Sequence, residues 1–162
     1  MKIVVISDTH LPERADRLPA KLLEEIKSAD MLVHAGDFVS PELFKELKSL
    51  CKNVKAVWGN MDPQEIREEL TQKEIFKVGN FKIGLYHGCG APSSMVDTLS
   101  AEFKNDKPDI IIFGHSHSAL NEKRAGILFF NPGSPTDKVF AAVNTYGIIE
   151  INDNIESRIV QL

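Results

Sequence analysis

The sequence predicts a mixed α/β fold, a four-layer αββα sandwich in which two mixed β-sheets pack between outer layers of helices. The 162 residues contain about ten strand-like segments but only four helical ones, too many strands for one open sheet flanked by helices. Strand-like and helical segments alternate in the first half, which is typical of parallel βαβ units. We expect one domain, 1–162, because a chain of this length buries an adequate core.

Five apolar runs carry the strand prediction. Each is short and rich in Val, Ile or aromatic residues, as strands buried on both faces are. The runs are KIVVIS (2–7), MLVHAG (31–36), VKAVWG (54–59), FKIGLY (81–86) and DIIIFG (109–114). Gly79 and Asn80 separate the run at 81–86 from the preceding KEIFKV, which predicts a hairpin. After about residue 120 we expect short antiparallel strands at GILFFNPGS, KVFAAVN, YGIIEIN and IESRIVQL.

Helix-start signals and apolar spacing predict four helices, at 19–28, 40–50, 62–70 and 94–104. Ser40 followed by Pro41 is typical of an N-cap and the first helical position. Asp62, followed by a proline, predicts the N-cap of the third helix, with a contact to a ligand or its surroundings as the alternative. Ser94 and Asp97 predict a capping box for the fourth helix.

Composition limits the classes of function. The formal net charge of -4 disfavours a nucleic-acid partner, which needs a basic face. No apolar run approaches the roughly 18–20 residues of a membrane span, and the N-terminal run is too short for a signal peptide. Cys51 and Cys89 form no CxxC motif, which suits a reducing compartment. We therefore expect a cytoplasmic protein with no membrane partner.

Polar side chains that can bind metal follow each of the five strong strands. They are Asp8, His10, Asp37, Asn60, His87, His115 and His117. Ligands of open α/β sheets gather at the carboxyl ends of the strands. A His-x-His pair in extended chain, such as GHSH, points both rings to the same side. We therefore expect these seven side chains to converge on one site.

The chemistry of the seven donors predicts phosphoester hydrolysis. Two carboxylates, one amide oxygen and four imidazoles favour Mn, Fe, Co, Ni or Zn over Ca or Mg. Seven donors are too many for one open catalytic ion, but suffice for two divalent ions about 3.5–4 Å apart that share a bridging carboxylate. Two such ions would attract phosphate, turn a shared water into a hydroxide nucleophile and stabilise charge on the phosphoryl oxygens.

Six motifs in order, SDTH, GDFVS, GNMD, HG, GHSH and NPGS, resemble those of the calcineurin-like metallophosphoesterases. The match runs from Ser7 to Ser134 and is closest to the small single-domain phosphodiesterase branch. The resemblance implies an αββα sandwich and two metal ions, with manganese expected, acting on small phosphodiesters or phosphomonoesters. It implies one ion held by Asp8, His10, Asp37 and His117, and a second held by Asp37, Asn60, His87 and His115. Asp37 would be the bridge, and the candidate catalytic residues are Asp37, Asn60, His10 and His115.

The chain departs from the larger members of that family at Met61, where they carry a His that contacts phosphate and can protonate the leaving group. His34 lies inside a predicted strand and is expected to be a core or hydrogen-bonding residue, so no imidazole is spare. Losing a general acid costs about 100-fold to 10,000-fold on poor leaving groups, which favours activated or diester substrates. Cys89, where many small relatives have another His, is expected to be a tolerated thiol.

The alternative function is a non-catalytic scaffold. A small branch of the same fold is a subunit of a membrane-trafficking coat, with a weakened metal site, and the stretch VGNFKIGLYHG is similar to it. The presence of all seven donors favours the enzyme. A nuclease is disfavoured because no basic stripe or aromatic platform for a polymer is evident. Small relatives often form homo-oligomers, but nothing in the sequence locates an interface. For Ser134, a role near phosphate and a simple turn remain equally open.

Overall fold

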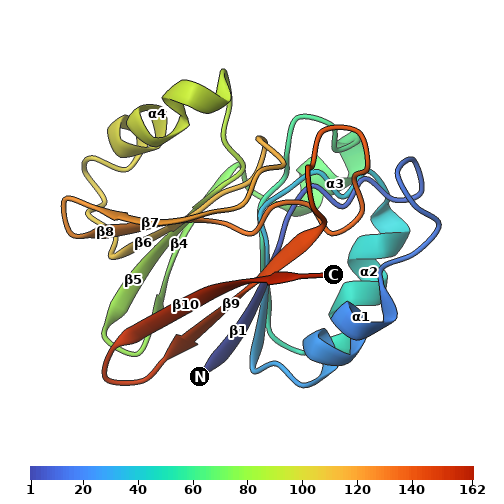
Figure 1. Ribbon diagram of the computed structural model, residues 1–162, viewed down its shortest axis with the longest axis horizontal. Helices are drawn as coiled ribbons and strands as arrows, with labels where there is room; N and C mark the ends of the chain where they lie inside the picture. The colour runs from blue at the N-terminus through green and yellow to red at the C-terminus, as the bar shows by residue number, and fades with distance from the viewer.

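Two five-stranded sheets pack between helices in the computed structural model, which describes residues 1–162 (Figure 1). The first sheet has the order β10-β9-β1-β2-β3 and consists of β1 (Lys2–Ile6), β2 (Met31–His34), β3 (Val54–Ala56), β9 (Thr145–Ile151) and β10 (Ile155–Gln161). The second has the order β4-β5-β6-β8-β7 and consists of β4 (Lys73–Val78), β5 (Phe81–Tyr86), β6 (Ile110–Ile112), β7 (Leu120–Arg124) and β8 (Ile127–Asn131). The helices are α1 (Ala20–Lys27), α2 (Pro41–Leu50), α3 (Gln64–Glu69) and α4 (Met95–Glu102), the last preceded by a 3₁₀ turn, Pro92–Ser94. The αββα prediction is confirmed.

Three apolar clusters correspond to the three interfaces between the four layers. The central cluster joins the sheets and includes Ile3, Val33, Ile83 and Ile110. A second cluster lies between the first sheet and helices α1 and α2, and a third lies between the second sheet and α4. The inner strands β1, β2 and β6 are covered on both faces, which explains why their sequences are nearly continuous apolar runs.

Parallel pairing brings the strand ends together. β1 pairs with β2 and β2 with β3 in parallel, through crossovers that contain α1 and α2. In the second sheet β5 pairs with β6, and β6 with β8, also in parallel. The hairpin of β4 and β5 across Gly79 and Asn80 is antiparallel, as predicted. The carboxyl ends of β1, β2, β3, β5 and β6 are therefore available to form one site.

Two of the cap predictions are wrong, and one is confirmed. Ser40 caps α2, since its Oγ accepts hydrogen bonds from the N–H groups of Glu42 and Leu43. Asp62 does not cap α3, whose N-cap is Pro63 with no side-chain bond. Ser94 precedes α4, but its side chain makes no cap bond; its hydroxyl donates to the carbonyl of Ala91 instead.

Two strand predictions also need correction. The segment 138–144 is a loop and not a strand, and several of its apolar side chains are exposed. Conversely, β7 was not predicted because its sequence, LNEKR, is polar. β7 is an edge strand that pairs only with β8, and edge strands carry charged residues because one side faces solvent.

None of the helices is long and apolar enough to cross a membrane. Both cysteines are free thiols: Cys51 is buried and Cys89 is exposed.

Candidate metal centre

The candidate ligands stand on sharp turns that directly follow the strands. Five of the eight non-glycine residues with positive φ belong to the predicted set of seven, namely Asp8 (φ 53°), His10 (42°), Asp37 (60°), His115 (67°) and His117 (55°). Left-handed backbone at a residue with a Cβ costs about 1–3 kcal/mol and clusters at functional sites. The fold therefore holds these side chains in conformations that an unconstrained chain avoids.

Two glycines allow the carboxylates to approach the backbone. A Cβ on Gly59 would lie 2.2 Å from Asp37 Oδ1, and a Cβ on Gly114 would lie 2.6 Å from Asp8 Oδ2. Both distances are shorter than any real contact, so a side chain at either position would displace a carboxylate. This close approach explains the glycine before Asn60 and before His115 in the sequence.

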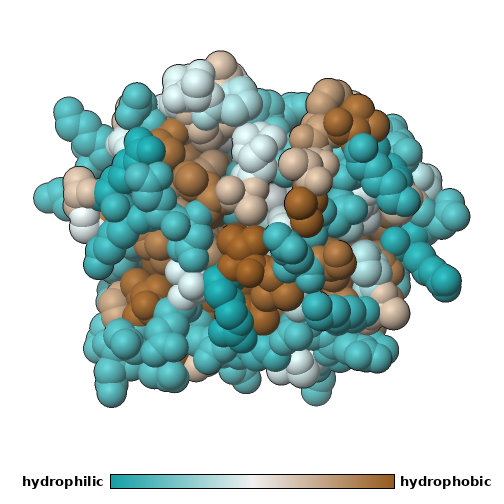
Figure 2. All heavy atoms as spheres, viewed as in Figure 1, coloured by the Kyte–Doolittle hydropathy of each residue, from teal (hydrophilic) through white to brown (hydrophobic).

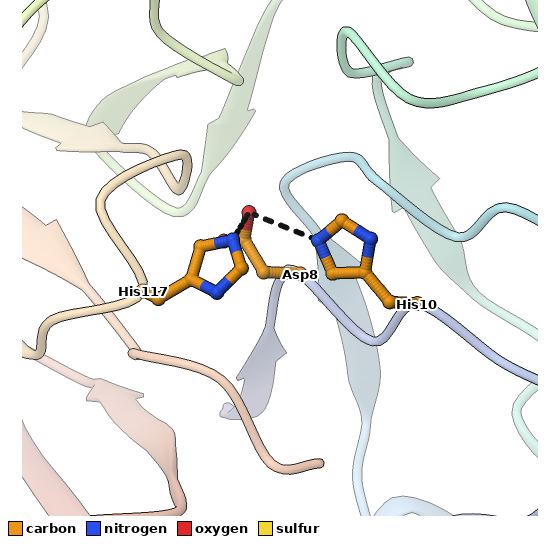
Figure 3. A group of neighbouring side chains, drawn as sticks. All are labelled: Asp8, His10 and His117. Atoms are coloured by element: carbon orange, nitrogen blue, oxygen red, sulfur yellow. Dashed lines mark ion pairs between the residues drawn. The ribbon is translucent and has the colours of Figure 1, made fainter. Parts of the chain in front are cut away.

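Asp8 lies between two imidazoles, both of which turn toward its carboxylate (Figure 3). His117 Nε2 is 3.3 Å from Asp8 Oδ1, and His10 Nε2 is 4.0 Å from the same oxygen. Two atoms that each bind one ion at about 2.1 Å lie roughly 3–4 Å apart. The three side chains therefore have the spacing of ligands that share one cation.

Asp37 connects this group to a second one. Its Oδ2 is 3.6 Å from His10 Nε2 and 3.3 Å from His87 Nε2. Asn60 Oδ1 lies 3.2 Å from His87 Nε2 and 2.9 Å from His115 Nδ1. All seven predicted side chains thus lie in one continuous cluster, with Asp37 between its two halves. Asp8 Oδ1 is also within 3.9 Å of His87 Nε2.

Three histidines have one ring nitrogen fixed outside the cluster, which leaves the other nitrogen facing into it. His87 Nδ1 bonds the carbonyl oxygen of Ala35 at 2.6 Å, and His115 Nε2 bonds that of Gly90 at 3.1 Å. His117 Nδ1 is paired with a carboxylate oxygen of Asp137. Such contacts orient imidazoles for metal binding and set which nitrogen carries the proton.

Positive charge is favoured at the centre of the cluster. Asp8 and Asp37 are both buried. Burial lowers the pKa of His87, but the hydrogen bond to Asp37 and the charges of Asp8 and Asp37 outweigh it and raise that pKa to about 9. Burial raises the pKa of Asp8. Burial also acts to raise the pKa of Asp37, but His87 and the N–H of Met61 hold it below its ordinary value.

An unsatisfied nitrogen supports the fit of a cation. His10 Nε2 is buried and has no hydrogen-bond partner, although it faces both carboxylates. Buried polar atoms are normally paired, and each exception needs an explanation. Burial lowers the pKa of His10, which favours the neutral imidazole that binds metal. An ion between His10, Asp8 and Asp37 would satisfy this nitrogen.

Two residues beside the site were missed or misassigned from the sequence. Asp137 is fully buried and accepts from the N–H groups of Val139 and Phe140 as well as pairing with His117. Asp62 accepts from the N–H groups of Asp37, Val39 and Gly59 instead of capping a helix. It therefore anchors the turn of Asp37, which is the alternative that the sequence left open.

The remaining sequence expectations can be judged from their contacts. His34 is buried, bonds Thr9 Oγ1 and the N–H of Gly36, and stacks on Phe38, so it has the expected core role. Burial holds its pKa well below the ordinary value. Ser134 Oγ donates to the carbonyl of Asp8, which makes it part of the loop framework rather than a group facing the site.

Comparison with known proteins gives concordant matches. A profile described as the calcineurin-like phosphoesterase superfamily domain matches residues 1–154. A probable metallophosphoesterase of Methanothermobacter thermautotrophicus is 35% identical over 84% of this chain and 78% of its own length. A phosphodiesterase of Methanocaldococcus jannaschii is 27% identical over 93% of both chains. The structure of Vps29 from Entamoeba histolytica complexed with Zn²⁺ superimposes with a TM-score of 0.81 at 28% identity, covering 99% of both chains.

Proposed function

Because this chain belongs to the calcineurin-like phosphoesterase superfamily, we propose that it is a dinuclear metal-dependent phosphoesterase that hydrolyses small phosphoesters, diesters in particular. The observation that carries the proposal is the cluster of seven donors, in which two buried carboxylates lie among four imidazoles. One ion is assigned to Asp8, His10, Asp37 and His117, and the second to Asp37, Asn60, His87 and His115. Asp37 is assigned as the bridge because its Oδ2 is within 3.6 Å of His10 and 3.3 Å of His87.

Two divalent ions, when bound, would lower the pKa of a shared water and withdraw charge from the phosphoryl oxygens. The protein residues orient and neutralise this centre. Asn60 is exposed and His115 is half-buried, so these two side chains stand at the mouth, where the phosphoryl group would enter. The all-oxygen and nitrogen donor set favours first-row divalent ions, and manganese is the metal we propose.

The mouth of the site offers no general acid at the position of Met61. Its side chain is 51% exposed and has no proton to give. Leaving groups must then depart as anions or be protonated by water, which slows poor ones by about 100-fold to 10,000-fold. Diesters and activated monoesters are therefore the proposed substrates.

The similarity to Vps29 supports one alternative, a scaffold that binds metal without turnover. The complete set of seven candidate donors favours the enzyme, since the scaffold branch is expected to have a weakened metal site. The unsatisfied Nε2 of His10 fits a bound cation in either case. The two functions differ in one observable, turnover by the metal-loaded protein.

The experiment compares the native protein with Asp37→Asn after metal removal and reloading with Mn²⁺. We expect the native protein to bind about two ions per chain, by elemental analysis, and to hydrolyse bis(p-nitrophenyl) phosphate in a chelator-sensitive manner. Asp37→Asn should lose ions and fall to the activity of the stripped protein, because the bridging charge is gone. Asp153→Asn, in the exposed turn between β9 and β10, is the matched control. Full activity of Asp37→Asn without metal would refute the mechanism, and metal binding without turnover on a panel of phosphoesters would favour the scaffold.

A further inference from the structure

An exposed aromatic ring stands beside the candidate metal centre. Phe140 is 66% exposed, whereas none of the other eight phenylalanines is exposed. Its ring centroid lies 5.8 Å from that of His117, at an interplanar angle of 89°. Val139 and Val143 of the same loop are 65% and 48% exposed. Figure 2 shows an apolar patch at the upper right, where Figure 1 draws the loop that leads into β9.

The ring is held in place by the same carboxylate that orients His117. Asp137 accepts from the N–H groups of Val139 at 2.8 Å and Phe140 at 3.2 Å, and it also pairs with His117 Nδ1. One buried side chain therefore fixes both the loop and the imidazole. The position of Phe140 relative to the centre is set by these bonds and not by packing in the core.

A cation covers part of the ring. The guanidinium carbon of Arg14 is 5.4 Å from the centroid of Phe140, and Arg14 Nε is 3.9 Å from Asp137 Oδ1. The cation–π contact and the edge contact with His117 together restrain the ring. Most of the ring surface nonetheless remains open to solvent. The ring therefore offers an apolar plane that is already restrained and has little conformational freedom left to lose when a ligand binds.

The placement of this plane suits one part of a phosphoester. His117 Nε2 faces Asp8 in the cluster, and Phe140 lies against the same imidazole. A substituent that extends from a phosphoryl group at the centre past His117 would meet Phe140. Planar aromatic substituents gain more there than alkyl ones, since rings prefer offset or edge contact with another ring.

We propose, on the premise of the function proposed above, that Phe140 is a specificity-determining platform which favours phosphoesters that carry a planar aromatic group. The ring makes no contribution to the bond-breaking step. Its effect is on affinity, and a single aromatic pair of this kind corresponds to about a twofold to tenfold preference.

The test measures binding and does not depend on turnover. Isothermal titration of the Mn²⁺-loaded protein uses two pairs of probes that differ in an aromatic group, phenylphosphonate against methylphosphonate and adenosine 5′-monophosphate against ribose 5-phosphate. The native protein should prefer the aromatic member of at least one pair. That preference should disappear in Phe140→Ala and persist in Phe140→Trp. The pair that responds tells whether the ring is attached at phosphorus or carried on a sugar.

Ile75→Ala is the matched control, because Ile75 is an exposed apolar side chain on the edge strand β4; it should keep the preference. An aromatic preference that is absent from the native protein, or that survives unchanged in Phe140→Ala, would overturn the platform and leave the proposed function standing. Failure of all four probes to bind the metal-loaded protein would also overturn the platform, whereas the proposed function is overturned separately, by the absence of metal-dependent hydrolysis of bis(p-nitrophenyl) phosphate.

Discussion

At the scale of single residues, Asp137 shows that the geometry of the candidate centre also depends on a residue outside the seven candidate donors. Its side chain is fully buried, pairs with His117 and holds the loop of Phe140 through two backbone N–H groups. Burial acts to raise the pKa of Asp137, but the N–H of Val139 and the contact with His117 hold it below the ordinary value. The carboxylate is therefore ionised, and its charge makes the His117 imidazole more basic, which would strengthen its binding to a metal ion.

Asp137→Asn should weaken metal binding while the fold remains. The amide oxygen can still accept a hydrogen bond, but the negative charge that increases the basicity of His117 is lost. We expect Mn²⁺ affinity to fall by about 10-fold to 100-fold, measured by titration calorimetry. The melting temperature of the metal-free protein is measured alongside, and Asp153→Asn serves as the exposed control. Unchanged Mn²⁺ affinity in Asp137→Asn would show that His117 does not act as a ligand oriented by this contact.

The convergence of the seven candidate side chains could be predicted from the sequence because each follows a strand with a clear apolar run. The roles of Asp137 and Asp62 could not be predicted, because the tertiary fold brings their hydrogen-bond partners together. The proline after Asp62 suggested a helix cap. In the structure three N–H groups from two loops need an acceptor, two of them buried and one partly buried, and α3 has only six residues. Buried donors without a partner cost more than an uncapped surface helix.

At the scale of elements, strand prediction succeeded where burial on both faces produces a continuous apolar run. Strand prediction failed for one polar strand and for one apolar loop. β7 is polar because it forms an edge, and 138–144 is apolar although it forms a loop. Local sequence cannot tell whether an apolar residue faces a core or solvent, and the exposed Phe140 is the example.

The N-cap of helix α2 makes a contribution to stability that can be measured. Ser40 Oγ accepts from the N–H groups of Glu42 and Leu43, so Ser40→Ala leaves both donors without this partner. We expect a loss of about 1 kcal/mol in the free energy of unfolding, measured by urea denaturation. Ser94→Ala is the matched control, since Ser94 makes no cap bond, and should change stability by less than about 0.5 kcal/mol. Equal effects of the two substitutions would show that the Ser40 bonds do not stabilise α2.

At the scale of the whole molecule, the candidate centre joins the two sheets. Asp8, His10, Asp37 and Asn60 follow strands of the first sheet, whereas His87, His115 and His117 follow strands of the second. The sheets otherwise meet through an apolar cluster, which is not directional. A metal ion bound by residues from both sheets would therefore fix the two sheets against each other at the carboxyl ends of their strands.

This geometry predicts that metal stabilises the entire fold and not only the loops. A ligand at 100 times its Kd adds about 2.7 kcal/mol to the native state, which for a chain of this size raises Tm by about 5–10 °C. Scanning calorimetry of stripped protein with added Mn²⁺ should show this increase, and excess chelator should reverse it. Mg²⁺ should raise Tm less because four of the seven donors are imidazoles. In Asp37→Asn the Mn²⁺ effect should be lost; if the variant gained as many degrees as the native protein, the stabilising ion would have to bind elsewhere.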